Sequence, residues 1–484
     1  MAHSTTFNNA GRQGQSPIPN LQSLCYNALM PYRCLADFLE TLAQAGELLR
    51  IDEPVDTNLR LSESVRQMAE SNRSALLFAA PGGSHVPVLA NLLASDARIC
   101  QALGVASLDE LAARIGRLLE SNAASNWFER LKGSAQPAAI QTASPREVRS
   151  AACQQIIRLG SDINLGELPL LQVAPDIPPA IHGPVVLSAE PDTHQPIAAR
   201  FDLQRLDANR LAVCWADHDE HARVLADYRA RSQKMPIAVV IGGDPAYLLA
   251  AAAPLEARTD LAALAGVLRE KPLDVVACRS VDLQVPAESE IVIEGFIDPT
   301  APLAAAGPLC APLGHATTPR LAPVMQVTAL THRANPLYAT MVPGQPPHEA
   351  STVARAMQRV FLPLTRLAMP DLVDYDLPEF AAARHWAAVS IRKTYPGQAH
   401  RAAHAAWSLP AVRFAKTLVV VDADVDVRDH EAVLAAIARH VNPATDLITE
   451  RGPADPFDPA TPSNTLGCRM AIDATEKLSG ERTN

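Results

Sequence analysis

Several features that mark particular classes of protein are missing from this sequence. Its eight cysteines are scattered and include no Cys-x-x-Cys pair, which argues against a zinc site or a disulfide framework and favours a reducing compartment. No apolar run reaches the roughly eighteen residues that a membrane-spanning helix needs. Residues 1–20 are polar and lack the hydrophobic segment of a secretion signal. We therefore expect a cytoplasmic protein without a membrane partner.

A surplus of positive charge is also missing. The chain has 42 Lys and Arg against 52 Asp and Glu, a formal net charge of −10. This balance argues against a nucleic-acid partner, which would require a basic face. Aromatic residues make up only 4% of the chain, whereas prolines number 40. We expect a core of Ala, Val and Leu, many loops, and two or three domains over 484 residues.

The N-terminal region alternates helical and strand patterns. Residues 1–30 are rich in Asn, Gln, Ser and Pro, which predicts a mobile extension. A helix is predicted next, because one stripe holds Leu35, Phe38, Leu39 and Leu42. Gly46 follows as its C-terminal cap. The remaining patterns predict strands at 47–51 and 75–79 and helices at 62–71 and 108–119.

The middle of the chain changes to short strands, and its end returns to helices and strands. Strands are predicted at 185–188, 198–203, 211–215 and 237–241, a spacing typical of a small barrel or sandwich. Near the end, a buried run over 417–421 precedes a helix at 430–440, which indicates a βα unit of an open α/β sheet. Asp422 and Asp424 follow that run. An unrelated α/β enzyme that binds phosphate or metal there is one alternative.

The stretch from Leu273 to His315 carries the most information. A β-branched run at 274–278 is followed by a turn at Val285-Pro286-Ala287 and a second strand at 290–297. In that strand Ile291, Ile293 and Gly295 share one face, the period of two of a paired strand. The segment then becomes a Pro/Gly/Ala loop, which we expect to contain no strand or helix and to lie over the surface.

The amino-acid sequence of this stretch resembles that of a known family. Val285-Pro286-Ala287, followed by Ser289-Glu290-Ile291-Val292-Ile293-Glu294-Gly295, is similar to the signature of the UbiD family of decarboxylases, enzymes that use prenylated flavin mononucleotide (FMN). The helix–GEL–strand–PVD opening at 35–56 and the ending at 466–475 extend the resemblance over about 31–477.

The resemblance implies an α+β fold with a central split β-barrel that binds the flavin. It implies an N-terminal α/β domain at 31–130, a linker at 131–154, the prenylated-FMN-binding split barrel at 155–330 and a C-terminal α/β oligomerisation domain at 331–484. Homodimers or homohexamers are the assemblies it favours. It also implies a flavin prenyltransferase as supplier of the cofactor.

The central candidates for chemistry are Gln195 and Arg200, which are five residues apart. In the family, an Asn at the first position binds a divalent metal. An Arg at the second lies between the flavin and the substrate carboxylate. A guanidinium suits a carboxylate because it donates two parallel hydrogen bonds. Arg200 is thus the predicted catalytic residue, and Gln195 offers the amide oxygen of Asn on a longer stem.

A metal site is implied by the same resemblance. His218, eighteen residues beyond Arg200, matches the family's metal-binding His, and imidazole is a common ligand of divalent transition metals. Asp260 takes the place of the third ligand, a Glu, and is one methylene shorter. Gln195, His218 and Asp260 would thus hold Mn2+ or Fe2+, with K+ as a further candidate ion, in a weakened or rebuilt site.

Further positions match the family's flavin contacts. Ile391-Arg392-Lys393-Thr394-Tyr395-Pro396-Gly397 is similar to the motif whose second basic residue meets the flavin phosphate, which implies that role for Lys393. The other residues that the resemblance places at the cofactor are Ala198, Ala199, Arg200, Cys214, Trp215, His218 and Pro254.

The two acids of the family's catalytic loop are missing. Counted back from Pro323-Val324-Met325, the loop places Ala306 and Ala311 at the acid positions, and methyl groups cannot transfer protons. A shifted alignment places Cys310 and His315 there instead. The proton would then come from His315, Cys310 or water.

The chain is therefore predicted to be an atypical UbiD-like decarboxylase. Its substrate would be an aromatic or α,β-unsaturated carboxylic acid, and the reaction would be a reversible loss of carbon dioxide. Two alternatives stay open: a decarboxylase of aroyl-CoA thioesters similar to phthaloyl-CoA decarboxylases, and a non-catalytic partner subunit that assembles with an active homologue.

Overall fold

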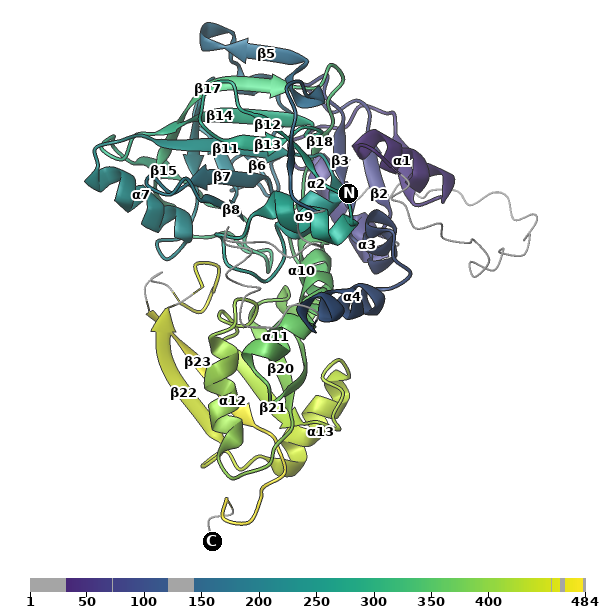
Figure 1. Cartoon of the computed structure of the whole chain (residues 1–484), viewed down its shortest axis with the longest axis vertical. Coiled ribbons are helices and arrows are strands. Elements are labelled where there is room, and N and C mark those ends of the chain that lie inside the picture. Colours follow the sequence, from purple (N-terminus) through teal and green to yellow (C-terminus); the bar gives the residue numbers. More distant parts are fainter. Residues whose placement is uncertain (1–31, 72, 121–142, 454, 462–465, 482–484) are drawn as a thin grey trace, which may run out of the picture.

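The computed structural model describes residues 32–71, 73–120, 143–453, 455–461 and 466–481. The extension predicted for 1–30 lies outside these residues, as does the first half of the linker predicted for 131–154. An N-terminal α/β part, a central curled sheet and a C-terminal α/β part follow one another (Figure 1). The predicted α+β class is confirmed. In the described parts of the chain, no helix has the length and apolar character needed to span a membrane.

The N-terminal part packs helices against a sheet of order β1-β2-β3-β18. Its first helix forms where the apolar stripe was predicted, because Leu35, Phe38, Leu39 and Leu42 are all buried. Its last strand, β18 (Tyr338–Ala339), comes from far along the chain and ties this part to the rest. The other elements are α1 (Leu35–Gln44), β1 (Leu48–Ile51), α2 (Arg60–Ser71), β2 (Ala75–Phe78), β3 (Val88–Ala90), α3 (Asp96–Leu103) and α4 (Leu108–Glu120).

The central part is a nine-stranded sheet that curls into a half-barrel. The strands follow the order β6-β9-β10-β17-β14-β11-β7-β8, and β5 pairs with β17. Neighbouring strands run antiparallel. The strands are β5 (Ile156–Leu159), β6 (Ala180–Ile181), β7 (Val185–Ala189), β8 (Pro196–Arg200), β9 (Leu203–Arg205), β10 (Arg210–Val213), β11 (Met235–Ile241), β14 (Ile291–Ile297) and β17 (Val324–His332).

Strand β14 lies at the centre of this sheet, between β11 and β17. Ile291, Ile293 and Val292 are all buried, so both of its faces are covered. At Gly295 the pairing register with β17 shifts. A methyl group on Gly295 would lie 2.1 Å from the carbonyl oxygen of Gln326, so no larger residue fits without moving the backbone.

Helices and a small second sheet cover the central part. The strand predicted at 274–278 forms β12, which pairs with β4 and β13 and not with β14. The covering elements are β4 (Arg146–Glu147), α7 (Glu220–Ala230), α8 (Pro245–Ala250), α9 (Leu261–Arg269), β12 (Asp274–Ala277) and β13 (Gln284–Pro286).

The loop after β14 corrects one expectation. It contains an antiparallel pair, β15 (Ala304–Ala306) and β16 (Arg320–Ala322), although no strand was predicted there. Ala306, Cys310 and Ala311 are buried and do not lie over the surface. The small side chain of Ala306 allows the loop to pack closely against Ala212 and its neighbours on β10.

The C-terminal part is a sheet of order β19-β20-β21-β23-β22 with helices on it. β20, β21 and β23 are parallel, and the outer strands are antiparallel to them. The predicted βα unit at 417–440 is present. The elements are α10 (Glu349–Val360), α11 (Leu362–Ala368), β19 (Leu372–Asp376), β20 (Trp386–Ile391), α12 (Gln398–Trp407), β21 (Thr417–Asp422), α13 (His430–His440), β22 (Leu447–Pro453) and β23 (Leu466–Asp473).

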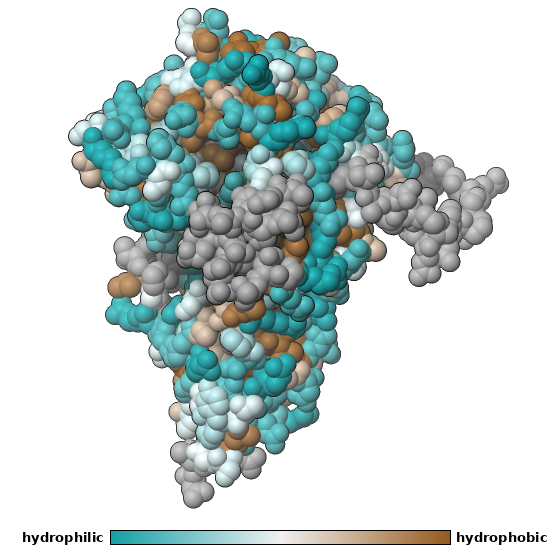
Figure 2. Space-filling model, in the orientation of Figure 1, coloured by the Kyte–Doolittle hydropathy of each residue, from teal (hydrophilic) through white to brown (hydrophobic). Residues whose placement is uncertain are grey.

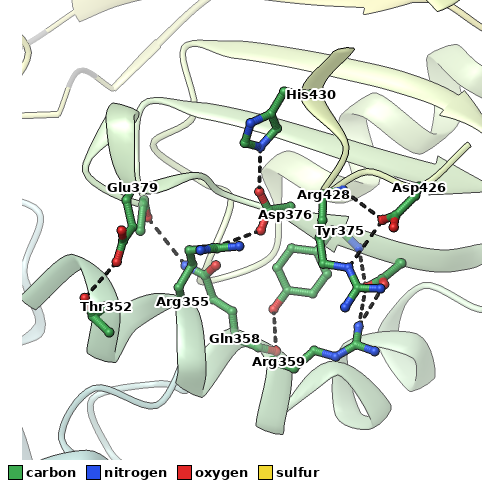
Figure 3. A network of polar contacts seen from close by, with 12 residues as sticks. Thr352, Arg355, Gln358, Arg359, Tyr375, Asp376, Glu379, Asp426, Arg428 and His430 are labelled. Carbon is green, nitrogen blue, oxygen red and sulfur yellow. Dashed lines mark hydrogen bonds and ion pairs between the residues drawn. The ribbon is translucent and has the colours of Figure 1, made fainter. Parts of the chain in front are cut away.

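A polar network fastens α10 to the C-terminal sheet (Figure 3). Asp376, at the end of β19, accepts from Arg355 at 3.2 Å and lies 3.2 Å from Nε2 of His430, the first residue of α13. Thr352 donates to Glu379 at 2.7 Å. Helix α10 therefore holds the C-terminal sheet at a fixed position below the central part.

Candidate active site

A cavity of about 480 Å3 lies between the central sheet and the C-terminal part. Strand ends and loops of the central part supply one side, and the N-terminal half of α10 supplies the next. The C-terminal part supplies the opposite side through Arg384, Phe414 and Phe457.

Small side chains form much of the cavity wall. Ala251, Ala252 and Ala253 follow α8 and line it, together with Ala199 at the end of β8 and Ala306 on β15. Because these side chains project little, the cavity has room for a flat ring system. Pockets of this size commonly bind small organic ligands and cofactors.

Arg200 places a positive charge in this wall. It ends β8, it is partly buried, and its guanidinium donates to Sδ of Met341. No carboxylate within the described residues forms an ion pair with it, and burial lowers its pKa. A partly buried guanidinium that forms no ion pair favours the binding of an anion.

Behind Arg200 lies Glu349, the first residue of α10. Its Oε1 accepts from the backbone N–H of Leu93 at 2.7 Å. Its Oε2 is buried and has no hydrogen-bond partner among the described residues. Burial raises the pKa of Glu349 to about 7, against the opposing effect of the positive charge of Arg200.

The C-terminal wall of the cavity is aromatic and basic. The ring of Phe414 lies 5.2 Å from the ring of His218, centroid to centroid, so the two parts of the chain meet there. The guanidinium groups of Arg384 and Arg413 stack on Phe414, at 4.6 Å and 4.9 Å from its centroid. Arg384 also pairs with Asp455.

The structure brings five of the predicted cofactor residues to this cavity. Ala199, Arg200, Cys214, His218 and Pro254 line it. Ala198 and Trp215 are buried beside it but do not line it. Each is next in sequence to a lining residue, and Trp215 packs on the rings of Phe201 and His221.

The other two members of the predicted metal set lie outside the cavity lining. Gln195 donates to the carbonyl oxygen of Arg258 at 3.3 Å. Asp260 caps α9 by accepting from the backbone N–H groups of Ala262 and Ala263. The described residues contain no cluster of three or more His, Cys, Asp or Glu side chains that could hold a metal ion. As arranged, this set does not fit a metal ion.

His315 and Lys393 also lie outside the lining. Burial lowers the pKa of His315, and the charged groups that act on it are His385, Asp458 and Lys416 of the C-terminal part. The Lys393 ammonium donates to Thr475 at 2.8 Å and to Glu481 at 2.6 Å, inside the C-terminal part. Asp422, from the alternative site, accepts from the backbone N–H of Glu476.

Several residues of the cavity wall were not predicted from the sequence. They include Asp202, Arg320, His348, Arg384 and Phe414. One signal was available for Asp202, because residues two apart on an extended chain lie on the same side, and Asp202 follows Arg200 at that spacing. The two arginines and Phe414 come together only through tertiary contacts.

Comparison with known proteins identifies the family. Three models of 3-octaprenyl-4-hydroxybenzoate carboxy-lyase match in the expected order: the N-terminal domain at residues 39–118, the Rift-related domain at 146–346 and the C-terminal domain at 351–474. The chain belongs to the UbiD family. An uncharacterised protein of Aquifex aeolicus is 35% identical over 453 residues, 93% of each chain.

Solved UbiD-class structures match over nearly the whole chain. HmfF from Pelotomaculum thermopropionicum, in complex with FMN, is 26% identical over 93% of this chain and 96% of its own, with a TM-score of 0.76. Vanillic acid decarboxylase of Sedimentibacter hydroxybenzoicus in its closed form is 25% identical over 93% and 94%, with a TM-score of 0.82. The open form of the same decarboxylase matches with a TM-score of 0.74, so this UbiD-family chain is arranged more like the closed form.

Proposed function

We propose that this chain is a decarboxylase that removes carbon dioxide from an aromatic or α,β-unsaturated carboxylic acid, with prenylated FMN bound in the cavity. The reverse carboxylation belongs to the same proposal. The observation that carries it is Arg200, a partly buried guanidinium on the cavity wall that forms no ion pair with a carboxylate among the described residues. HmfF has been solved in complex with FMN and with prenylated FMN, which supports the choice of cofactor.

The cavity residues fit such a cofactor. The alanines of the wall leave space for a tricyclic ring, and Arg200, Arg320 and Arg413 offer positive charge for its phosphate and for a substrate carboxylate. When bound, prenylated FMN supplies the electron sink for the carbon–carbon bond that breaks.

The chain's own residues bind and orient the acid. Arg200 donates two hydrogen bonds to the substrate carboxylate and fixes its plane against the ring. This attraction disappears when the carboxylate becomes neutral carbon dioxide, which favours release. Phe414 and Phe457 cover the cavity from the C-terminal side and exclude water.

The metal and the assembly state stay proposals. Mn2+ or Fe2+, with K+ as a further ion, would require Gln195 and Asp260 to move toward His218, so no step of the reaction is assigned to a metal. A homodimer or homohexamer is supported by the apolar surface at the upper end of the molecule (Figure 2). There Ile156, Ile157 and Leu159 on β5 are exposed.

Two alternatives make different predictions. An aroyl-CoA decarboxylase would act on the CoA thioesters of aromatic acids and not on the simple acids. A non-catalytic partner subunit would copurify with an active homologue and have no activity alone.

The test is co-expression with a flavin prenyltransferase, followed by assay against a panel of aromatic acids and their CoA thioesters. We expect visible flavin absorption and release of carbon dioxide from at least one acid. Protein that stays colourless after this treatment, in the presence of added Mn2+ and K+, would contradict the proposal.

A further inference from the structure

An aspartate and a buried histidine form a pair on the cavity wall next to Arg200. Nδ1 of His182 lies 2.8 Å from Oδ2 of Asp202. The backbone N–H of Gly183 donates to Oδ1 of Asp202 at 3.1 Å. The His182 side chain is fully buried, whereas that of Asp202 is 21% exposed, and Asp202 lines the cavity. The carboxyl group thus faces the cavity, with the imidazole behind it.

The contacts of His182 determine how many protons this pair holds. Nε2 of His182 lies 3.3 Å from the carbonyl oxygen of Leu171, which can only accept a hydrogen bond. Nδ1 faces Asp202, and an ionised carboxylate is also only an acceptor. In its imidazolium form, His182 donates from both ring nitrogens, to the carbonyl oxygen of Leu171 and to the Asp202 carboxylate. The pair stores one proton at the edge of the cavity.

The other side chains around Asp202 are poor proton donors at neutral pH. Arg200 precedes it on the same segment and has no proton to give at neutral pH. Burial raises the pKa of both Cys214 and Cys310 to about 11, with the charge of Asp202 adding to the effect. Burial raises the pKa of Tyr338 as well, and its hydroxyl has no hydrogen-bond partner among the described residues.

We propose that the Asp202–His182 pair donates the proton that replaces the departing carboxylate, a role that the methyl groups of Ala306 and Ala311 cannot fill. This inference rests on the proposed decarboxylase function. The bond between the substrate carbon and its carboxylate breaks, carbon dioxide leaves, and an electron pair is left on the carbon. The Nδ1 proton of His182 passes to the Asp202 carboxylate, and Asp202 passes it on to this carbon. The ring becomes neutral, keeps Nε2–H on Leu171, and regains its proton from solvent.

The first test uses the full chain loaded with prenylated FMN and the acid that the substrate panel identifies. Asp202→Asn should lower turnover by a factor of about 100 to 10,000, the usual contribution of a general acid. His182→Gln should lower it less, because the carboxyl group remains. Flavin absorption and the substrate dissociation constant should stay within about twofold of the wild type. Asp207→Asn, on an exposed turn, and His430→Gln, from the pair with Asp376, are the matched controls and should retain full turnover.

A second test does not depend on turnover. In protein labelled with 15N-histidine, with the His182 signals assigned by their absence in His182→Gln, His182 should show imidazolium shifts at pH 7. In Asp202→Asn these shifts should change to those of a neutral ring, because the counter-charge is lost.

Three results would overturn the inference. One is an Asp202→Asn variant that turns over within twofold of the wild type. Another is loss of turnover in His315→Gln or Cys310→Ala but not in Asp202→Asn, which would identify a different donor. The third is a neutral His182 ring at pH 7 in the wild type. If the flavin-loaded wild type converts no acid, the proposed function fails instead, and the NMR experiment still decides whether the pair holds the proton.

Discussion

The guanidinium of Arg200 and the thioether of Met341 are in contact on the cavity wall, and this sulfur is the polar partner of Arg200 within the described residues. A thioether is a weak acceptor and carries no charge. The partly buried positive charge of Arg200 therefore has no direct ion-pair partner among the described residues, although Glu349 and Asp202 lie near enough to act on it. A site of this kind is less stable when empty than when it holds an anion.

Arg200→Met should therefore stabilise the ligand-free protein. Removal of a partly buried charge that forms no ion pair should raise the free energy of unfolding by about 1–3 kcal/mol, measured by urea denaturation. Arg98→Met is the matched control. Arg98 is fully buried and bonds Glu47 at 2.7 Å and the carbonyl oxygen of Leu92 at 3.0 Å, so its loss should cost about 3–5 kcal/mol. If Arg200→Met lowered the free energy of unfolding as much as Arg98→Met does, this account of Arg200 would be contradicted.

Glu349→Gln should change how stability depends on pH. The pKa of Glu349 is about 7 in the folded protein, above the ordinary value of 4.5. The folded state thus binds more protons between these values, and stability falls as pH rises through this window. Gln does not titrate. As pH rises from 4.5 to 8, the free energy of unfolding of the variant should therefore increase by up to about 3 kcal/mol relative to that of the wild type. If the difference in free energy of unfolding between the variant and the wild type stayed constant across that range, the raised pKa of Glu349 would be contradicted.

Gly295→Ala should destabilise the central sheet. The added methyl group would meet the carbonyl oxygen of Gln326 at 2.1 Å, in the middle of a nine-stranded sheet. We expect a loss of about 3 kcal/mol or more in the free energy of unfolding, or no soluble protein. Gly116→Ala, in α4, places a methyl group 3.7 Å from Pro363 and should stabilise the protein by about 0.5–1 kcal/mol. Equal effects of the two changes would refute the packing argument for Gly295.

The ion pair between Arg73 and Glu379 should couple the N-terminal and C-terminal parts. Two hydrogen bonds of 3.2 Å and 2.8 Å join the two side chains. A double-mutant cycle with alanine at both positions should give a coupling energy of about 1 kcal/mol. The exposed pair of Arg33 and Asp37 should give about 0.3 kcal/mol or less in the same cycle. A coupling near zero for Arg73 and Glu379 would mean that the two parts are held together by other contacts.

Local patterns predicted most of the fold. The helix predicted at 430–440 has those bounds, because Asp429 caps its first turn by accepting from Glu431 and Ala432. The strand predicted at 290–297 forms β14 with one residue less. What could not be predicted was that β12 and β14 belong to different sheets, since strand pairing depends on contacts between distant residues. The short strands β15 and β16 were missed because each has only three residues and neither Ala-Ala-Ala nor Arg-Leu-Ala has strand propensity of its own.

The candidate site was predictable only where it depends on one continuous segment. Arg200 and Ala199 share the end of β8, and both line the cavity as expected. His315 was inferred from an alignment shift, and the fold turns it toward Asp458 of the C-terminal part. Lys393 donates a hydrogen bond to Glu481, which lies 88 positions away along the chain. The His182–Asp202 pair joins two loops and becomes visible only in the folded chain.

Titration of the flavin-loaded Arg200→Gln variant with the substrate acid tests the central claim most directly. We predict that the flavin absorption persists, that affinity for the carboxylate falls at least about 100-fold, and that release of carbon dioxide stops. Arg210→Gln, an exposed position on β10, should behave like the wild type. An Arg200→Gln variant that binds and decarboxylates the acid as the wild type does would contradict the account.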